Sequence, residues 1–504
     1  MPFIKNMDVT LRPDWAVIDI GSNSVRLVIY EGPERAPIPV FNEKMLCGLG
    51  QYDPETGYLD KDRAESALAV LQRFKTILDT VRPRYLDVFT TAGIRDAKDG
   101  ANFLKEIEKI GFTPRLLSGE EEARLAALGI LSGAPEILKR SGGALAGDIG
   151  GGSLELCHIE ARADDPLGSR VSLPLGGLRL KTQFEHDRSA ARQYIQQTLA
   201  EIDWLTSCPA TALYVVGGAW RALARIAIVQ WNYPIQSLDH YQLKKNAMLD
   251  ICKLVSKQSV SSLESMSWVQ KRRAATLPFA AIVLETLLQD YGIQEVVFSS
   301  HGVREGVLFD KLPPQRRQQD PILTLAREGA RRIGVSVSPD AEAVAHFLEP
   351  LFPHKKSLAK DLLMPASILS NIGRRLLPHE RAKQTAQLMM GLPMRGLSHP
   401  ARVFLATMLY YRHGGNSSDL EHILPMGLLS DDMQEEAIVL GHAMRFVGDF
   451  DPMGSKLMAQ CRFHLEADDL ILHLSPAAEK LWGPVTEKRF LRIAHAMGRI
   501  GTLR

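Results

Sequence analysis

The 504-residue sequence predicts an α/β protein with two similar lobes around a cleft, followed by a mainly α-helical C-terminal domain. A short loop with nearly the same residues occurs twice, and strand and helix patterns alternate after each copy. Beyond a proline- and charge-rich stretch at residues 313–321, the pattern becomes helical. Because each α/β unit has to bury the apolar faces of its own strands and helices, the duplication indicates two lobes.

The repeated loop occurs in "AVIDIGSNSVRLVIY" (16–30) and in "LAGDIGGGSLELCHI" (145–159). In both copies an apolar run leads to Asp-Ile-Gly, then to small residues and a Ser, and then to alternating apolar residues, which predicts strand, tight turn and strand. Glycine and serine in such a turn leave several backbone N–H groups uncovered, and these can point at one anion. Two unrelated β-turns would be the simpler explanation, but the copies agree at Asp, Ile, Gly, Ser and Leu. The pair therefore predicts a two-sided clamp for phosphate with a metal ion.

Two other glycine-rich phosphate motifs do not fit these loops. A dinucleotide fingerprint opens a helix, whereas these loops open a strand. A Walker loop ends in Gly-Lys-Ser/Thr, which the chain lacks.

The composition is that of an ordinary globular protein, and the length suggests about three domains at roughly 150 residues each. A net charge of +2 gives no argument for nucleic-acid binding. Five scattered cysteines without a Cys-x-x-Cys pair argue against zinc or disulfides and suggest a reducing compartment. No apolar run reaches 18 residues, so we expect a cytoplasmic protein without membrane contact.

The elements of the first two lobes follow from periodicity. We assign 1–133 to the first lobe and 134–312 to the second. Besides the two hairpins, the pattern predicts helices at 63–78, 100–111, 120–133, 188–205, 219–229 and 272–292, and strands at 85–93, 113–119, 212–218 and 295–300.

The C-terminal domain is assigned to residues 321–504, after the linker. It is expected to be mainly helical and to end in a small α+β piece. The predicted elements are helices at 322–334, 341–352, 399–415 and 431–448, a hairpin within 455–476 and a final helix at 487–501.

Three adjacent acids begin the helix in "LSGEEEARLAALG" (117–129). Ser118 and Glu121 fit a capping box, and Glu120 suits the positive end of the helix dipole. Glu122 is then left for the cleft, where it could orient a water and accept its proton as the water attacks phosphorus.

Carboxylates also flank the second loop. Asp148 precedes the turn and Glu155 follows it, which suits Mg²⁺, an ion that takes one or two protein carboxylates together with phosphate oxygens and water. Asp19 has the same place in the first loop and could reach the metal through water. Each acid alone could equally be a buried turn cap.

Further polar residues occur where strands end and helices begin. Thr91 and Arg95 in "TTAGIRDA", and Arg304 in "HGVREG", could bind phosphate oxygens. A surface ion pair such as Arg304 with Glu305 is the simpler alternative. Gly217-Gly218 could accommodate a nucleotide base or further phosphate, or could serve close packing of helix on strand.

Five stretches together, "IDIGSNSVRLVIY", "TTAGIRDA", "SGEEEARL", "GDIGGGSLEL" and "GVREG", resemble the exopolyphosphatase/guanosine pentaphosphate phosphohydrolase (Ppx/GppA) family. The resemblance covers about residues 14–310. It implies two actin-like (ribonuclease H-like) lobes, because the family belongs to the superfamily of actin, sugar kinases and heat-shock chaperone ATPases. It also implies that Glu122 is the catalytic carboxylate and that Asp148 and Glu155 serve Mg²⁺ and the attacked phosphate. The residues implied to hold substrate phosphates are Ser22, Asn23, Ser24, Thr91, Arg95, Gly151, Gly152, Ser153 and Arg304.

The sequence departs from the family pattern at two places. Ala219 and Trp220 follow the Gly217-Gly218 pair, where the family usually has Thr. Ser370-Asn371 stand where longer members, which resemble HD-type metal hydrolases, have His-Glu or His-Asp. We therefore expect an HD-like C-terminal domain without the metal motif.

The expected function is Mg²⁺-dependent removal of terminal phosphate from inorganic polyphosphate. Guanosine pentaphosphate is the alternative substrate, and guanosine tetraphosphate or pentaphosphate is a candidate partner. A kinase of the same superfamily and a non-catalytic sensor of polyphosphate or alarmone are rival functions. The resemblance also implies a homodimer. The basic residues Lys355, Lys356, Arg374, Arg375, Arg381 and Lys383 could guide a polyanion or form a solvated helix face.

Overall fold

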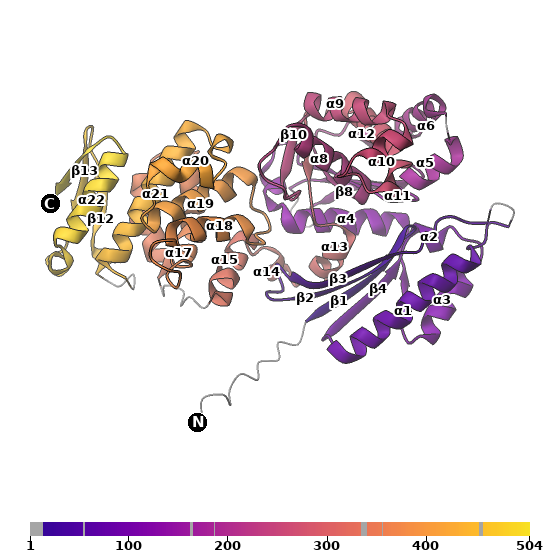
Figure 1. The fold of residues 1–504 in the computed structure, drawn as a ribbon, viewed down its shortest axis with the longest axis horizontal. Helices are drawn as coiled ribbons and strands as arrows, with labels where there is room; N and C mark the ends of the chain where they lie inside the picture. Colours follow the sequence, from indigo (N-terminus) through magenta and orange to yellow (C-terminus); the bar gives the residue numbers. More distant parts are fainter. Residues whose placement is uncertain are drawn as a thin grey trace. The chain divides into compact units, whose positions relative to one another are not determined.

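The computed structural model describes residues 14–53, 56–161, 165–185, 187–333, 340–354, 356–452 and 457–504. The chain forms two compact units, Met1–Gln319 and Asp320–Arg504, which are described separately here (Figure 1). The first unit contains two sheets, and the second is mainly helical with a small sheet. This is the predicted α/β architecture followed by a helical region. The predicted boundary between the lobes, after residue 133, stays a prediction.

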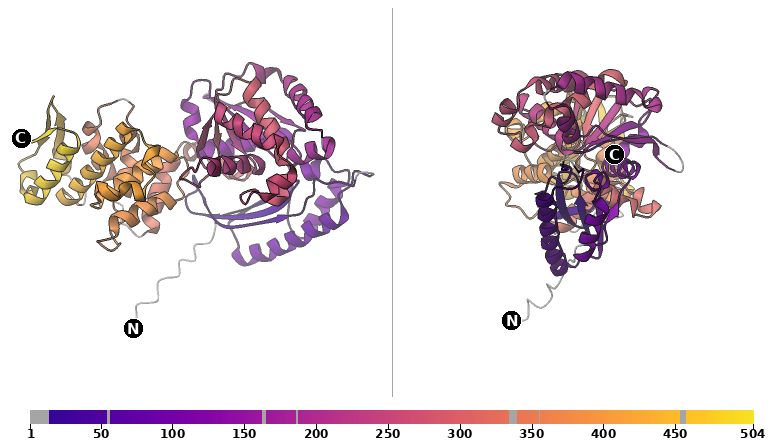
Figure 2. Two further views of the ribbon diagram at one scale, coloured as in Figure 1. Left: turned by 45° about the horizontal axis from the view of Figure 1, so that its top comes forward. Right: turned by 90° about the vertical axis from the view of Figure 1, so that its right-hand side faces the viewer.

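The first sheet has the strand order β3-β2-β1-β4-β5. β1 and β2 form the first predicted hairpin, and β4 lies parallel to β1 on its other side. Helices α1 and α3 pack on one face, where Phe74 and Ile107 are fully buried against strand residues such as Ile18 (Figure 1, Figure 2). The elements are β1 (Trp15–Ile20), β2 (Ser24–Glu31), β3 (Ile38–Leu46), α1 (Lys61–Val81), β4 (Tyr85–Thr90), α2 (Ala92–Arg95), α3 (Gly100–Lys109) and β5 (Arg115–Leu116).

The second sheet has the order β10-β11-β9-β6-β7-β8. Its strands β8-β7-β6-β9-β11 repeat the order of the first sheet, including the antiparallel hairpin and the parallel strand beside it. The duplication seen in the sequence is therefore also one of topology. The strands are β6 (Ala144–Ile149), β7 (Leu154–Ile159), β8 (Leu167–Leu173), β9 (Ala212–Val216), β10 (Tyr241–Lys244) and β11 (Glu295–Phe298).

The helices of the second lobe bury an extensive core. α12 is buried along its whole apolar length, and the Trp220 indole N–H donates to the Ala280 carbonyl at 3.0 Å. The helices predicted at 272–292 and 188–205 are each divided in two. The helices here are α5 (Gly177–Phe184), α6 (Arg188–Ala200), α7 (Asp203–Thr206), α8 (Gly218–Gln230), α9 (Lys245–Lys257), α10 (Val260–Ser265), α11 (Lys271–Ala274) and α12 (Leu277–Asp290).

Two helices, α4 (Gly119–Gly133) and α13 (Val303–Asp310), lie between the two sheets (Figure 1). They cross at very short range because both carry glycine at the contact: a Cβ at Gly306 would overlap the Leu125 carbonyl oxygen, and one at Gly129 would overlap the Gly302 carbonyl oxygen. This crossing fixes Glu122 on one helix relative to Arg304 on the other.

The second unit begins with short helices and ends in a three-stranded sheet of order β12-β13-β14. The predicted hairpin is β12-β13, whereas β14, parallel to β13, was not predicted. The linker contains α14 (Pro314–Arg317). The remaining elements are α15 (Pro321–Arg332), α16 (Ala341–Leu348), α17 (Leu358–Leu369), α18 (Arg381–Gly391), α19 (His399–Arg412), α20 (Leu420–Ile423), α21 (Asp431–Phe450), β12 (Arg462–Leu465), β13 (Asp469–His473), α22 (Pro484–Ala496) and β14 (Ile500–Leu503).

Within the part of the chain that the structure describes, no helix has both the length and the apolar character needed to cross a membrane.

Candidate active site

The two repeated loops have the same backbone hydrogen bond. The Gly21 N–H donates to the Ser24 carbonyl at 3.0 Å, and the Gly150 N–H donates to the Ser153 carbonyl at 2.9 Å. In each hairpin the Asp that precedes the turn is the last residue but one of its strand. The sequence repeat therefore encodes two equivalent turns, one in each sheet.

The two loops face each other directly. A Cβ placed on Gly151 would lie 3.3 Å from the Ser22 Cβ, and one on Gly152 would lie 3.3 Å from the Ser22 Oγ. Between them is a cleft of about 250 Å³. The predicted residues that line it are Ser22, Asn23, Ser24, Thr91, Glu122, Asp148, Gly151, Gly152, Ser153, Glu155 and Arg304, together with Asp19.

The start of α4 directs one acid into the cleft. The Ser118 hydroxyl accepts the Glu121 N–H at 3.1 Å, which confirms half of the predicted capping box, whereas the Glu121 carboxylate pairs with Arg124. Glu120 is exposed and pairs with Arg170 at 3.0 Å. Glu122 is thus the acid of the three that lines the cleft, and it is buried.

Arg95 lies in the four-residue helix α2, which directly follows β4, as the sequence predicted. It is not among the residues that line the cleft, and its contact with phosphate stays a prediction. Its Nη1 donates to the Leu117 carbonyl at 3.1 Å and to the Glu122 carboxylate at 3.4 Å. The structure therefore gives Arg95 a positioning contact with Glu122.

Three carboxylates are crowded on one side of the cleft. Burial, followed by the charges of Glu155 and Asp148, raises the pKa of Glu122 well above its ordinary value. Burial likewise raises the pKa of Asp148 to about 6 and that of Glu155 to about 8. Since burial and mutual repulsion both disfavour the ionised forms, a cation in the cleft would be bound in exchange for protons.

The same carboxylates fit a divalent cation. Glu155 Oε1 accepts from the Ser172 hydroxyl at 2.8 Å, whereas the buried Oε2 has no hydrogen-bond partner in the described structure. Among the described residues, no three or more His, Cys, Asp or Glu side chains are grouped so as to hold a metal ion. Mg²⁺ does not need such a group, because one or two carboxylates suffice when phosphate and water complete its coordination.

Arg304 pairs with Asp19 of the first hairpin, and its Nη1 donates to Oδ2 at 2.7 Å. The alternative pair with Glu305 is not formed, since Glu305 accepts from the Tyr30 hydroxyl at 2.7 Å and from the Gly302 N–H at 2.9 Å. The pair with Asp19 ties the second lobe to the first across the cleft.

Four further cations that the sequence analysis did not single out line the cleft: Lys44, Arg221, Arg272 and Arg273. Burial and the neighbouring Arg273 lower the pKa of Lys44 to about 8, and burial and Arg304 lower that of Arg221 to about 10. The position of Arg221 in the first turn of α8, just after the Gly217-Gly218 pair, was the one local signal that could have revealed it.

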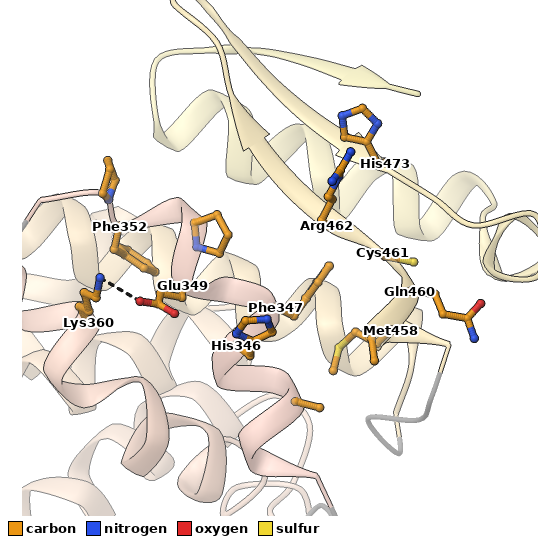
Figure 3. A pocket seen from close by; sticks show the side chains of 14 residues that line it. His346, Phe347, Glu349, Phe352, Lys360, Met458, Gln460, Cys461, Arg462 and His473 are labelled. Carbon is orange, nitrogen blue, oxygen red and sulfur yellow. Dashed lines mark ion pairs between the residues drawn. The ribbon is translucent and has the colours of Figure 1, made fainter.

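A larger cavity, of about 740 Å³, lies within the second unit between α16 and the β12-β13 hairpin (Figure 3). Its lining acid, Glu349, is paired with Lys360 at 2.9 Å. The larger cavity therefore has one acid among its lining residues, and that acid is already paired, whereas several carboxylates line the cleft.

Comparison with known proteins identifies the chain. The profile of the Ppx/GppA phosphatase family matches residues 28–315, more than half of the sequence, and the profile "Exopolyphosphatase, C-terminal" matches residues 360–502. The chain belongs to the Ppx/GppA phosphatase family. The predicted family and the predicted class, a hydrolase of phosphoanhydride bonds, are confirmed.

Curated relatives of this Ppx/GppA chain include two kinds of protein. Retrograde regulation protein 2 of Saccharomyces cerevisiae is 27% identical over 457 residues, which cover 82% of this chain and 75% of that protein. Exopolyphosphatase 1 of Mycobacterium tuberculosis is 25% identical over 312 residues, which cover 59% of this chain and 87% of that protein.

Solved structures confirm the actin-like fold of the first unit. An exopolyphosphatase from Cytophaga hutchinsonii has a TM-score of 0.54 at 24% identity and covers 58% of this chain and 96% of its own. The Aquifex aeolicus Ppx/GppA family member has a TM-score of 0.51 at 24% identity and covers 61% and 99%. At 24% sequence identity, the similarity to these two structures establishes the fold alone.

Proposed function

We propose that this Ppx/GppA protein is a Mg²⁺-dependent exopolyphosphatase, which hydrolyses the terminal phosphoanhydride bond of inorganic polyphosphate and releases orthophosphate. The observation that carries the proposal is the position of Glu122, a buried carboxylate that faces two equivalent phosphate loops across one cleft. A curated relative named exopolyphosphatase supports the substrate.

The residues divide the chemistry among them. Backbone N–H groups of the two loops hold the terminal phosphate, as uncovered amides in glycine turns do. Glu122 orients a water and accepts its proton while the water attacks phosphorus opposite the leaving chain. Arg95 holds the Glu122 carboxylate in place through its Nη1. In-line attack then releases orthophosphate and leaves the chain shorter by one unit.

Asp148 and Glu155 are the residues that would hold Mg²⁺. When bound, Mg²⁺ neutralises charge on the transferred phosphoryl group. The unpartnered Glu155 Oε2 and the raised pKa of both acids support this assignment.

Replacing Asp148 with Asn should raise the Mg²⁺ concentration needed for half-maximal activity by about tenfold or more, because the variant loses one of the two anionic ligands. Mn²⁺ binding, measured by electron paramagnetic resonance without substrate, should weaken in parallel. Asp250→Asn, an exposed acid on α9, is the matched control. An unchanged metal requirement in Asp148→Asn would place the metal elsewhere.

The lining of the cleft favours a phosphate chain over a nucleotide. Lys44, Arg221, Arg272, Arg273 and Arg304 supply cationic groups for successive phosphates. At the Gly217-Gly218 pair, the predicted place for a base or further phosphate, Arg273 donates to the Gly218 carbonyl and so places another cation beside the pair. Guanosine pentaphosphate remains the second candidate because its terminal phosphates and those of polyphosphate are chemically alike.

The test is release of orthophosphate by the purified protein with Mg²⁺, from long-chain polyphosphate and from guanosine pentaphosphate at matched concentrations of terminal phosphate. Faster release from polyphosphate is the expected result. Faster release from the nucleotide would assign guanosine pentaphosphate as the substrate in place of polyphosphate. Formation of ADP together with a phosphorylated acceptor would indicate a kinase. Binding of polyphosphate without any release would favour a sensor.

Two other expectations stay proposals. The homodimer rests on the family resemblance, and size-exclusion chromatography with light scattering tests it directly. Guidance of polyphosphate by the basic residues of the second unit predicts that activity on long chains falls steeply with salt. Lys355, one of these residues, lies outside the described residues.

A further inference from the structure

A cluster of basic side chains surrounds the end of α19 in the second unit, with one member buried and the others partly or fully exposed. It draws on the segment after α17, the start of α18, the end of α19 and the last turns of α21. The helices α17, α18 and α21 all contact α19 directly. The cluster consists of Arg374, Arg381, Arg412, His413 and Arg445.

Arg412 is its buried member, with 8% of its surface exposed. Its Nη2 donates to the Asn371 Oδ1 over a long 3.4 Å, and its Nε is buried without a hydrogen-bond partner. Among the described residues, no carboxylate forms an ion pair with it. Buried guanidinium groups in proteins are normally paired, because an unpaired buried charge is costly.

The neighbouring imidazole is also unsatisfied. His413 Nε2 is buried without a partner, so two adjacent residues at the end of α19 present unused nitrogen atoms. An unpaired buried polar atom requires an explanation, such as a bound ion or water that is not part of the chain.

Glycines on the surrounding segments make room for these side chains. A Cβ at Gly448 would overlap the Arg412 guanidinium, and one at Gly414 would lie 2.5 Å from the Arg445 Nη1. A Cβ at Gly373 would lie 2.9 Å from the His413 Nε2. The basic side chains are therefore packed directly against glycine backbone, which a larger residue at these positions would prevent.

The charge around Arg412 is strongly positive. Burial and the arginines beside it, Arg412 and Arg381 first, lower the pKa of His413 to about 3. Burial and Arg374 lower the pKa of Arg412 to about 10. Asp449, the acid that acts on Arg412, is itself paired with Arg489 at 2.7 Å.

The departure from the family pattern at Ser370-Asn371 lies beside this basic cluster, since Asn371 contacts Arg412. Where the resemblance expects a ligand of a metal cation, the chain has an amide that accepts from Arg412. A fixed cation with further arginines around it attracts anions, so the charge preference is the opposite of that of a metal site.

We propose that Arg412 and Arg445, together with His413, form a binding site for a phosphate-class oxyanion at the end of α19 in the helical unit, distinct from the hydrolytic cleft. Guanidinium groups suit such a ligand because their N–H donors match the oxygens of phosphate in pairs. The ligand supplies the missing negative charge and joins α19 to α21. The proposal is independent of the reaction proposed for the cleft.

The test is equilibrium dialysis of the full-length protein against radiolabelled orthophosphate, with EDTA present and with chloride adjusted to constant ionic strength. The wild type should bind one more phosphate per chain than Arg412→Met or Arg445→Gln, or bind it at least about tenfold more tightly. Arg462→Gln, an exposed arginine on β12 outside the cluster, should bind like the wild type. Phosphate bound in the cleft is common to all variants and cancels in the difference.

Arg445→Gln decides the result if Arg412→Met does not fold, because Arg445 is only half-buried. The same dialysis with tripolyphosphate distinguishes a free ion from the end of a phosphate chain. The site is assigned to whichever of the two ligands loses more affinity when Arg445 is replaced by Gln. The proposal would be overturned if, for each ligand, Arg445→Gln and Arg462→Gln bound as much as the wild type. Complete displacement of phosphate by chloride at equal ionic strength would also overturn it.

Discussion

We expect that replacing Glu122 with Gln lowers turnover by roughly 10²–10⁴-fold and leaves the proposed binding of polyphosphate nearly intact. The amide keeps the shape of the side chain and its place in the first turn of α4, but it cannot accept a proton from the attacking water. The two loops that we propose to hold the phosphate do not include Glu122, so binding should change little. Single-turnover phosphate release and equilibrium binding of polyphosphate measure the two effects separately.

Glu120→Gln is the matched control for this prediction. Glu120 lies in the same helical turn and carries the same charge, but its side chain is 67% exposed and pairs with Arg170 outside the cleft lining. It should keep wild-type turnover. A Glu122→Gln enzyme with more than about a tenth of the wild-type rate would remove Glu122 from the role of general base.

The parts of the site that the sequence predicted well are local. A turn closed by a hydrogen bond between Gly21 and Ser24 depends on four consecutive residues, so its repetition at Gly150–Ser153 was visible in the sequence. Glu122 followed by elimination, because capping and dipole effects within one helical turn account for its two neighbours.

Contacts between distant segments could not be predicted. Arg304 pairs with Asp19 across 285 positions, and Arg273 reaches the Gly218 carbonyl across 55. Neither pairing leaves a local pattern. The contact of Arg95 with Glu122 was missed for the same reason, since it depends on where α4 packs and not on the residues around Arg95.

The second unit shows the same limit. Its hairpin and the helices α15, α16, α19, α21 and α22 follow the apolar periodicity, whereas α17 and α18 were not predicted. Strand β14 was also missed, because its pairing with β13 joins segments about 30 residues apart. The cluster around Arg412 depends on four segments, and its glycines would each be taken for a turn or a helix end when considered alone.

Gly306→Ala should destabilise the first unit by about 3 kcal/mol or more, at the upper end of the range for overpacking. The added methyl group would overlap the Leu125 carbonyl oxygen, which is backbone and cannot move away by changing a rotamer. The helices α4 and α13 would have to separate, and these carry Glu122 and Arg304. The thermal midpoint should fall by several degrees, and the folded fraction should also lose activity.

Gly391→Ala is the control for the substitution itself. Gly391 ends α18, and a Cβ there would meet no atom within 4 Å, so alanine should be neutral or slightly stabilising. If the two variants have the same thermal midpoint and Gly306→Ala keeps full activity, the close crossing of α4 and α13 is not what holds the base and the arginine in place. If Gly306→Ala loses more activity than its folded fraction explains, the spacing of these two helices sets the geometry of the cleft. The glycines at the crossing are then as necessary to hydrolysis as the two loops that we propose to bind phosphate.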